Sequence, residues 1–342
     1  MSPNTKRPTL ADVAKLAGVS LGTASRALSV PQRLKPATLK KVNEVVAQLG
    51  YMRNGAARAL ASRKTRTIGA VFPTIDNPVY ANAINSLQRA SWALGYQLLI
   101  ASHEYDSVQE SDVTRTLMER GIDGVILVGT DHEEGVYNLI RQHGLPYVLI
   151  WSLDETTYPH CIGFSNHTAA YNMARLVLAH GHKKIAICGG SSRHNERSRA
   201  RVAGTLAALA EAGLRIPARW TIEEPFSFEG GRRALQKLWA GKSRPTALIC
   251  GTDIQAIGAL HECQALGIDV PGHLSITGFD DIEYAGITTP PLTTVHVPTD
   301  QIGIRAAGRI VALIEGKGPA AEEPLVANVI ERGSLGPARD QH

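Results

Sequence analysis

The sequence has few cysteines and no long hydrophobic run, and both scarcities narrow what the protein can be. Its four cysteines, Cys161, Cys188, Cys250 and Cys263, lie far apart without a CxxC pair, so we expect buried thiols in a reducing compartment. No apolar run reaches the roughly 20 residues that span a bilayer. The first ten residues, MSPNTKRPTL, lack the apolar segment of a secretory signal. We therefore expect a cytoplasmic protein that does not contact a membrane.

Acidic residues are scarce at one end of the chain. Residues 1–66 hold thirteen Lys and Arg but only two acids, Asp12 and Glu44, which leaves a net charge of +11. The whole chain carries +5, so the remainder carries −6. Such asymmetry favours a polyanionic partner for the N-terminal segment, and nucleic acid is the partner expected.

Signatures of catalysis are also missing. IGAVFPTIDNP stands where a dinucleotide-binding GxGxxG would follow the first strand, and no GxxxxGK[ST] or HExxH occurs. His180 and His182 form a lone HxH without a third metal ligand. Asp280 and Asp281 are neighbours in sequence, which does not show that their two carboxylates meet at one catalytic point. We expect neither an enzyme, a cofactor nor a metal. A non-specific architectural nucleic-acid protein is a weaker alternative, because it would not need so large a second domain.

The N-terminal segment predicts three short helices. Thr9 and Asp12 suit the start of the first helix, Gly18 its end, and Ser20 the start of a second helix, SLGTASRALS. A third is expected at about 36–49, with Pro36 where a missing N–H is tolerated. The expected inward positions are Leu10, Val13, Ala14, Ala17, Ala24, Ala27, Leu28, Leu39, Val42, Val45, Val46 and Leu49. Two helices joined by a tight turn and braced by a third predict a helix-turn-helix, and the alternative is a plain bundle with a solvated face.

These residues carry a family resemblance. TLADVAKLAGVSLGTASRAL, followed by KVNEVVAQLGYMRNGAARALAS, closely resembles the helix-turn-helix and hinge of the LacI/GalR family of bacterial regulators. The resemblance implies a DNA-binding domain at 1–51, a hinge helix and linker at 52–66, and a hinge leucine, Leu60, that wedges into the minor groove. A core contact is the alternative for Leu60. The DNA-binding residues expected are Thr9, Leu10, Ser20, Leu21, Gly22, Thr23, Ser25, Arg26, Arg33, Asn54, Ala57 and Leu60.

Some positions depart from the family pattern. Leu21 and Gly22 stand where side chains usually read bases, and neither can donate a hydrogen bond to a base edge. Base reading then falls on Thr23, Ser25, Arg26, apolar contacts from Leu21, and the hinge.

From residue 67 the pattern alternates between strands and helices. IGAVF, YQLLIA, GVILVG, YVLIW, KIAICGG, ALICG and LSITGF predict buried parallel strands. Helices are expected at about 80–94, 109–120, 136–142, 169–180, 199–212, 231–238 and 256–266. This alternation predicts an α/β domain of two doubly wound lobes, whose ligand binds at the carboxyl ends of the strands.

The same family resemblance covers this region, through IGAVFPTIDNPVYANAI, LAHGHKKIAICGG, PTALICGTDIQAIGAL and VPGHLSITGFDD among others. It implies a periplasmic-binding-protein-like core for effector binding and dimerisation at 67–342. The N-lobe is expected at about 67–163 plus 296–322, and the C-lobe at about 164–295 plus 323–338. The missing export signal and the basic N-terminal segment argue against transport.

Several side chains are candidates for effector binding. They follow strand ends, or match effector positions of the family: Asn77, Tyr80, Trp151, Asn195, Arg197, Arg201, Phe226, Thr252 and Asp280. An aromatic ring with Arg and Asp suits a polyol. Tyr80 and Trp151 are equally candidates for core aromatics, and Asp280–Asp281 for a cap.

Four arginines, Arg193, Arg197, Arg199 and Arg201, crowd the expected mouth of the cleft. Guanidinium groups suit carboxylates and phosphates, which indicates a sugar acid or sugar phosphate, while a solvated charged face is the alternative. We expect a ligand-responsive homodimer, a repressor of a carbohydrate or sugar-acid catabolic operon, on a pseudo-palindromic operator. The ending ERGSLGPARDQH has no leucine heptad, so a dimer is favoured over a tetramer.

Overall fold

The computed structural model describes residues 8–52, 64–153, 160–318 and 323–339. The chain divides into two compact units, Met1–Thr65 and Arg66–His342, and each is described by itself. Within the described residues, no helix combines the length and the apolar character that a membrane span requires.

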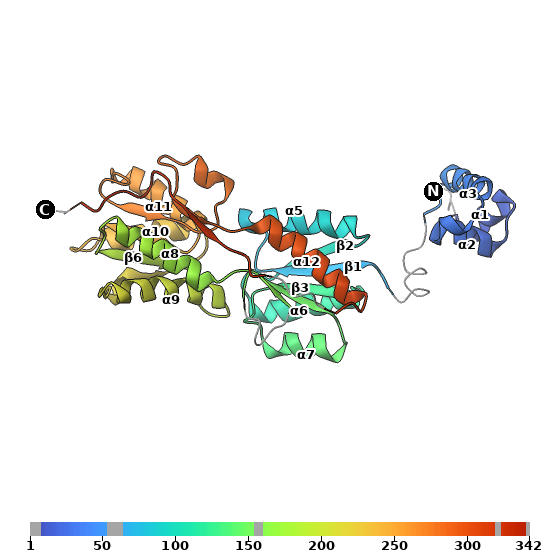
Figure 1. Ribbon diagram of the computed structural model, residues 1–342, viewed down its shortest axis with the longest axis horizontal. Coiled ribbons are helices and arrows are strands. Elements are labelled where there is room, and N and C mark those ends of the chain that lie inside the picture. Colours follow the sequence, from blue (N-terminus) through green and yellow to red (C-terminus); the bar gives the residue numbers. More distant parts are fainter. Residues whose placement is uncertain (1–7, 53–63, 154–159, 319–322, 340–342) are drawn as a thin grey trace, which may run out of the picture. The chain divides into compact units, whose positions relative to one another are not determined.

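The first unit contains the three predicted helices, with a short 3-10 turn before the third: α1 (Leu10–Ala17), α2 (Leu21–Ser29), η1 (Pro31–Arg33) and α3 (Pro36–Leu49) (Figure 1). Thr9 and Asp12 form a capping box, in which each side chain accepts a hydrogen bond from the other's backbone N–H. Gly18 ends α1 at φ 61°, a left-handed conformation that costs glycine little. Lys35 precedes α3 without a side-chain cap.

The core of this unit is small and apolar. Most predicted inward positions form it, with small side chains at its centre and larger ones half-buried around them: Val13, Ala14, Ala17, Ala24, Ala27, Val42 and Val45, with Leu10, Leu39, Val46 and Leu49 at the edge. Leu28, also predicted to point inward, is half-buried outside this cluster. Small residues let α1, α2 and α3 approach closely, so the three helices pack into one rigid unit.

The second unit begins with a parallel sheet of order β2-β1-β3-β4-β5: β1 (Thr67–Phe72), β2 (Gln97–Ser102), β3 (Gly124–Val128), β4 (Tyr147–Ile150) and β5 (Cys161–Ile162). One face packs against α5 (Pro78–Ala93) and α12 (Thr299–Ile314), and the other against α6 (Ser107–Glu119) and α7 (Glu134–Gln142) (Figure 1). We call this sheet and its four helices the N-lobe.

A second parallel sheet has the order β7-β6-β8-β9: β6 (Ile185–Gly189), β7 (Thr221–Glu223), β8 (Ala247–Cys250) and β9 (Ser275–Thr277). Its helices pack in two pairs, α8 (Asn166–Ala179) with α9 (Glu196–Glu211), and α10 (Phe228–Trp239) with α11 (Asp253–Ala265). We call this part the C-lobe. The antiparallel pair β10 (Thr294–His296) and β11 (Asn328–Ile330) lies where the chain leaves the C-lobe for α12 and returns.

The predicted helices of the second unit are present, but each begins two or three residues before its predicted start. Most of these helices begin at a polar cap that lies about one turn before the predicted start. Side chains that cap in this way are Asn77, Asp106, Ser165, Asn195, Ser227 and Thr252.

One strand prediction was wrong. β2 was expected to be buried, but it is an edge strand, and Leu99 and Ile100 are 36% and 39% exposed. The cysteine prediction is confirmed for Cys188, Cys250 and Cys263, which are free and buried, while Cys161 is half-buried.

Candidate functional site

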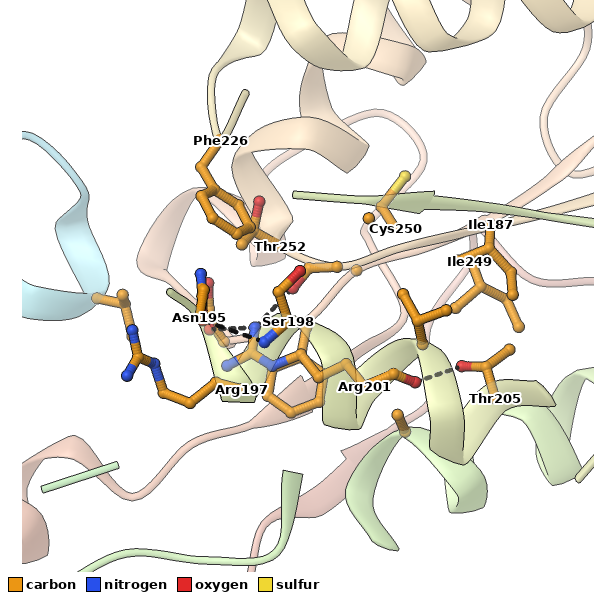
Figure 2. A pocket seen from close by; sticks show the side chains of 18 of the residues that line it. Ile187, Asn195, Arg197, Ser198, Arg201, Thr205, Phe226, Ile249, Cys250 and Thr252 are labelled. Carbon is orange, nitrogen blue, oxygen red and sulfur yellow. Dashed lines mark hydrogen bonds and ion pairs between the residues drawn. The ribbon is translucent and has the colours of Figure 1, made fainter. Parts of the chain in front are cut away.

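A cavity between the N-lobe and the C-lobe encloses about 680 Å³ of empty space, part of it open to solvent. All nine side chains predicted for effector binding line it: Asn77, Tyr80, Trp151, Asn195, Arg197, Arg201, Phe226, Thr252 and Asp280. They come together because the carboxyl ends of the parallel strands of both sheets point toward it. Figure 2 shows Asn195, Arg197, Phe226 and Thr252 on one side of this space, with Arg201 beside them.

The start of α9 places the two arginines. The Asn195 side chain accepts a hydrogen bond from the Ser198 N–H at 3.1 Å and caps the helix. Arg197 and Arg201 then lie four residues apart, on one face of the helix, and both line the cavity.

The same helix end ties the two lobes together. Nη1 of Arg197 donates to the Val128 carbonyl at 2.9 Å, across the cleft. Glu196 accepts from the Thr130 N–H at 2.8 Å and from the Ser152 hydroxyl at 2.5 Å. Burial acts to raise the pKa of Glu196, but Arg197 and these hydrogen bonds outweigh it and lower the pKa to about 2. The lobes are therefore joined through an ionised carboxylate.

Two hydrogen bonds and a cation–π contact hold the Arg201 side chain in place. It donates from Nε to Asn166 Oδ1 at 2.9 Å and from Nη1 to the Gly251 carbonyl at 2.6 Å. Its guanidinium carbon lies 3.6 Å from the centre of the Phe279 ring, a cation–π contact. The side chain is thus fixed before any ligand arrives, which is the preorganisation that a binding site requires.

Asp280 lies beside Arg201 in the cavity. Its Oδ1 lies 3.6 Å from Arg201 Nη1, and its buried Oδ2 finds no hydrogen-bond partner among the described residues. Burial raises the pKa of this carboxyl well above its usual range, and Arg201 only partly opposes the rise. A buried carboxyl oxygen without a partner is costly, so this atom is suited to a ligand hydroxyl.

Tyr80 and Trp151 are core aromatics that also line the cavity. Trp151 and Tyr80 are almost fully buried, and their rings pack edge to face at 5.1 Å, yet both line the cavity. Tyr105 and Phe226 meet across the cleft with ring centres 5.3 Å apart. Tyr105 was missed in the sequence, although it follows β2 at the same edge of the sheet as the other candidates.

The expected cluster of four arginines does not converge. Arg193 and Arg199 do not line the cavity: Arg199 pairs with Asp131 of the N-lobe at 2.6 Å, and Arg193 is exposed. The alternative of a cap at Asp280–Asp281 is not borne out, because the 3-10 turn Glu283–Gly286 has no side-chain cap and the Asp281 carboxylate pairs with Arg332 at 2.7 Å. Only the inward-facing half of the charge run belongs to the site.

The first unit exposes most of its predicted DNA-binding residues. Leu21, Gly22, Arg26 and Arg33 are exposed, whereas Ser25 is half-buried. Leu10 packs half-buried against the core and Thr9 belongs to the capping box of α1. The hydroxyls of Ser20 and Thr23 hydrogen-bond to each other at 2.9 Å. Three further candidates, Asn54, Ala57 and Leu60, lie outside the described residues.

In the part of the chain that the structure describes, no three His, Cys, Asp or Glu side chains are grouped so as to hold a metal ion. Both ring nitrogens of His182 instead form hydrogen bonds within the C-lobe, one with the Thr246 hydroxyl and one with the Gly336 carbonyl.

A helix-turn-helix unit followed by a two-lobed α/β unit with a cavity at its strand ends defines a class, the ligand-responsive DNA-binding transcriptional regulators. Residues 9–54 match the model of bacterial regulatory proteins of the lacI family, and residues 174–335 match a periplasmic binding protein-like domain. The chain belongs to the LacI family of bacterial transcriptional regulators.

The chain matches transcriptional regulators over almost their whole length. Catabolite control protein A of Priestia megaterium is 31% identical, across 86% of this chain and 89% of that protein. The transcriptional repressor PurR of Photobacterium profundum is 31% identical, across 90% and 92%. The Lac repressor dimer, solved bound to operator and the anti-inducer ONPF, shares the fold with a TM-score of 0.85, at 22% identity across 97% of this chain and 100% of that one.

Proposed function

We propose that this protein is an effector-controlled repressor of a carbohydrate or sugar-acid catabolic operon, acting as a homodimer on a pseudo-palindromic operator. One observation carries the proposal: the cavity holds a fixed guanidinium, Arg201, beside the partnerless carboxyl oxygen of Asp280. A vicinal diol needs a donor and an acceptor placed side by side, and this pair supplies both.

The rest of the cavity fits the same ligand class. The Asn77 and Asn195 side-chain carbonyls are engaged in capping α5 and α9, so their amide groups remain as donors toward the cavity. The rings of Tyr105 and Phe226 offer faces on which the C–H groups of a sugar pack. A polar ligand would thus be bounded by hydrogen bonds on one side and aromatic rings on the other.

Charge favours the acidic members of the class. Two arginines line the cavity, Glu196 pairs with one of them, and the raised pKa of Asp280 makes its carboxyl a poor counter-charge for the other. An excess of positive charge remains, which a ligand carboxylate or phosphate would neutralise.

Exposed apolar residues support the homodimer. Trp92 and Leu94 at the end of α5, with Leu99 and Ile100 on the neighbouring β2, are 66%, 45%, 36% and 39% exposed. We call these four residues the β2 patch. A patch on an unpaired sheet edge invites a second copy related by a two-fold axis. The Lac repressor, whose fold this chain shares, was solved as a dimer on its operator.

In this proposal each copy places α2 in one major-groove half-site, and the hinge residue Leu60 enters the central minor groove. Effector binding changes how the N-lobe and the C-lobe meet, and so the spacing of the two hinges. The coupling is the difference in effector affinity between the DNA-competent and incompetent states, about 1–3 kcal/mol in typical cases.

The test is selection of operator sites from random DNA by the full-length protein, with and without a panel of sugars, sugar acids and sugar phosphates. We expect a palindrome to be selected and one acidic compound to shift its affinity tenfold or more. Selection of no sequence would contradict the proposal, and tight binding of neutral sugars alone would contradict the preference for acids.

A further inference from the structure

The first turn of α2 exposes an apolar side chain where polar ones would be expected on a helix that binds DNA. Leu21 is the first residue of α2 and is 55% exposed. It does not belong to the core cluster formed by α1, α2 and α3. A single exposed leucine is common on protein surfaces, so its exposure alone carries no inference.

The two polar side chains that flank Leu21 in the first turn of α2 bond to each other. The hydroxyls of Ser20 and Thr23 bond to each other at 2.9 Å, and Ser20 also accepts from the Thr23 N–H at 3.1 Å. Both hydroxyls are therefore engaged in capping α2 and are poorly placed to read a base. Leu21 is then the prominent side chain of this turn.

Gly22, next to Leu21, has no side chain that could keep α2 away from DNA. A Cβ atom built at Gly22 would have Ser20 Oγ at 3.9 Å as its nearest neighbour, so the space over this position is open. The backbone of α2 can approach a surface more closely here than a residue with a side chain would allow. The next exposed polar group on this side is Arg26, one turn further along the helix.

The major groove offers few apolar features. Each base pair presents hydrogen-bond donors and acceptors there, and the 5-methyl group of thymine is the distinctive apolar one. An exposed leucine whose two hydroxyl neighbours bond to each other complements that methyl group, because its side chain has no hydrogen-bond donor or acceptor.

We infer that Leu21 recognises the 5-methyl group of one thymine in each half-site, while Gly22 lets α2 approach close enough for this contact. The inference rests on the proposed function, because that function places α2 in the major groove. In this inference the first turn of α2 contacts bases through an apolar side chain, and the second turn, which holds Ser25 and Arg26, contacts them through hydrogen bonds.

The test replaces each thymine of the selected operator in turn with deoxyuridine, which lacks only the methyl group. We expect one position per half-site at which the change weakens binding by roughly fourfold, the worth of one buried methyl-sized group, and roughly 16-fold when both half-sites are changed. Other thymines should tolerate the replacement within about twofold.

Variants of the protein identify the reader. Leu21→Ala should bind the thymine and deoxyuridine operators equally, because nothing is left to contact the methyl group. Leu16→Ala is the matched control, since Leu16 is a similarly exposed leucine, at 51%, on α1. That variant should keep the full preference for thymine.

Three results would overturn the inference. If the wild-type protein binds a selected palindrome but no deoxyuridine weakens binding, the methyl contact is absent and the proposed function stands. If Leu21→Ala keeps the preference, another residue makes the contact. If no sequence is selected at all, the proposed function and this inference both fail.

Discussion

Arg201 occupies the centre of the cavity, and its contacts make its replacement informative. Arg201→Ala should abolish the response to effector while operator binding changes by less than about twofold, because the DNA-binding unit is a separate compact unit. The variant also loses the partner of Asp280, but the raised pKa of this carboxyl lets it become neutral, which limits the loss of stability. Operator binding measured across an effector titration, together with a melting curve, separates the two effects.

Arg193→Ala is the matched control, since Arg193 is exposed and does not line the cavity. A response that survives in Arg201→Ala would remove this residue from the effector site.

Glu196 makes part of the stability depend on pH. Its pKa is about 2 in the folded protein and 4.5 ordinarily, so its stabilising effect is complete above pH 4.5 and is lost as the pH falls toward 2. A shift of this size corresponds to at most about 3 kcal/mol. Glu196→Gln should therefore lower the free energy of unfolding at pH 7, and the difference from the wild-type protein should shrink at pH 3.

Urea unfolding at the two pH values measures this difference. Glu134→Gln provides the comparison, because Glu134 forms an exposed pair with Arg141, and it should change stability little at either pH. An equal loss for Glu196→Gln at pH 7 and pH 3 would mean that its charge does not stabilise the fold.

At the residue scale, the rule that ligands meet the carboxyl ends of strands, together with the family resemblance, found nine residues that the structure brings together. The arginine cluster was overestimated because a charge run was taken as one group. The helical repeat places Arg197 and Arg201 on one face and turns Arg199 away. The engagement of Ser20 with Thr23 was not predictable in this detail, because side-chain pairing depends on rotamers.

At the scale of elements, the turn after β3 shows how closely the two lobes meet. Gly129 has φ 93°, and a Cβ atom there would lie 1.7 Å from Nη1 of Arg197 and 2.7 Å from Oε1 of Glu196. Gly129→Ala should therefore displace the start of α9, break its hydrogen bonds to Val128 and Thr130, and weaken the response to effector.

Gly144→Ala separates backbone strain from this clash. Gly144 also has a positive φ, 59°, but nothing lies within 4 Å of an added Cβ, so its cost is the strain alone, about 1–2 kcal/mol. Hydrogen exchange at the first turn of α9 should accelerate in Gly129→Ala and not in Gly144→Ala. Equal exchange in both variants would show that the contact is not needed to hold the lobes together.

The two mispredicted elements were missed for different reasons. β2 has the apolar composition of a buried strand, but its place at the edge follows from the order of the sheet, which no local pattern contains. No helix was predicted at α12, although its local signal is present: Ile302, Ala306 and Ile310 recur there at helical spacing and are buried.

At the scale of the whole molecule, the β2 patch gives a direct test of the homodimer. Trp92→Glu places a charge among exposed apolar side chains, so it should produce monomers and weaken operator binding by at least about tenfold, because paired half-sites are then no longer bound together. Light scattering gives the mass, and an operator titration gives the affinity. Ile304→Glu, at a 56% exposed position of α12, should remain dimeric. A dimeric Trp92→Glu would place the interface elsewhere.

The position of α12 in the chain has a consequence for synthesis. The N-lobe sheet ends with β5 at Ile162, yet α12, which covers one of its faces with α5, begins only at Thr299. At about 5–20 residues per second, a ribosome needs roughly 8–30 s to add the residues from β5 to the end of α12. During that interval the apolar face of the nascent N-lobe is covered by α5 alone, while most of the C-lobe emerges. The first lobe to be translated is completed only after most of the second has been made, which makes the unfinished chain a natural client for chaperones.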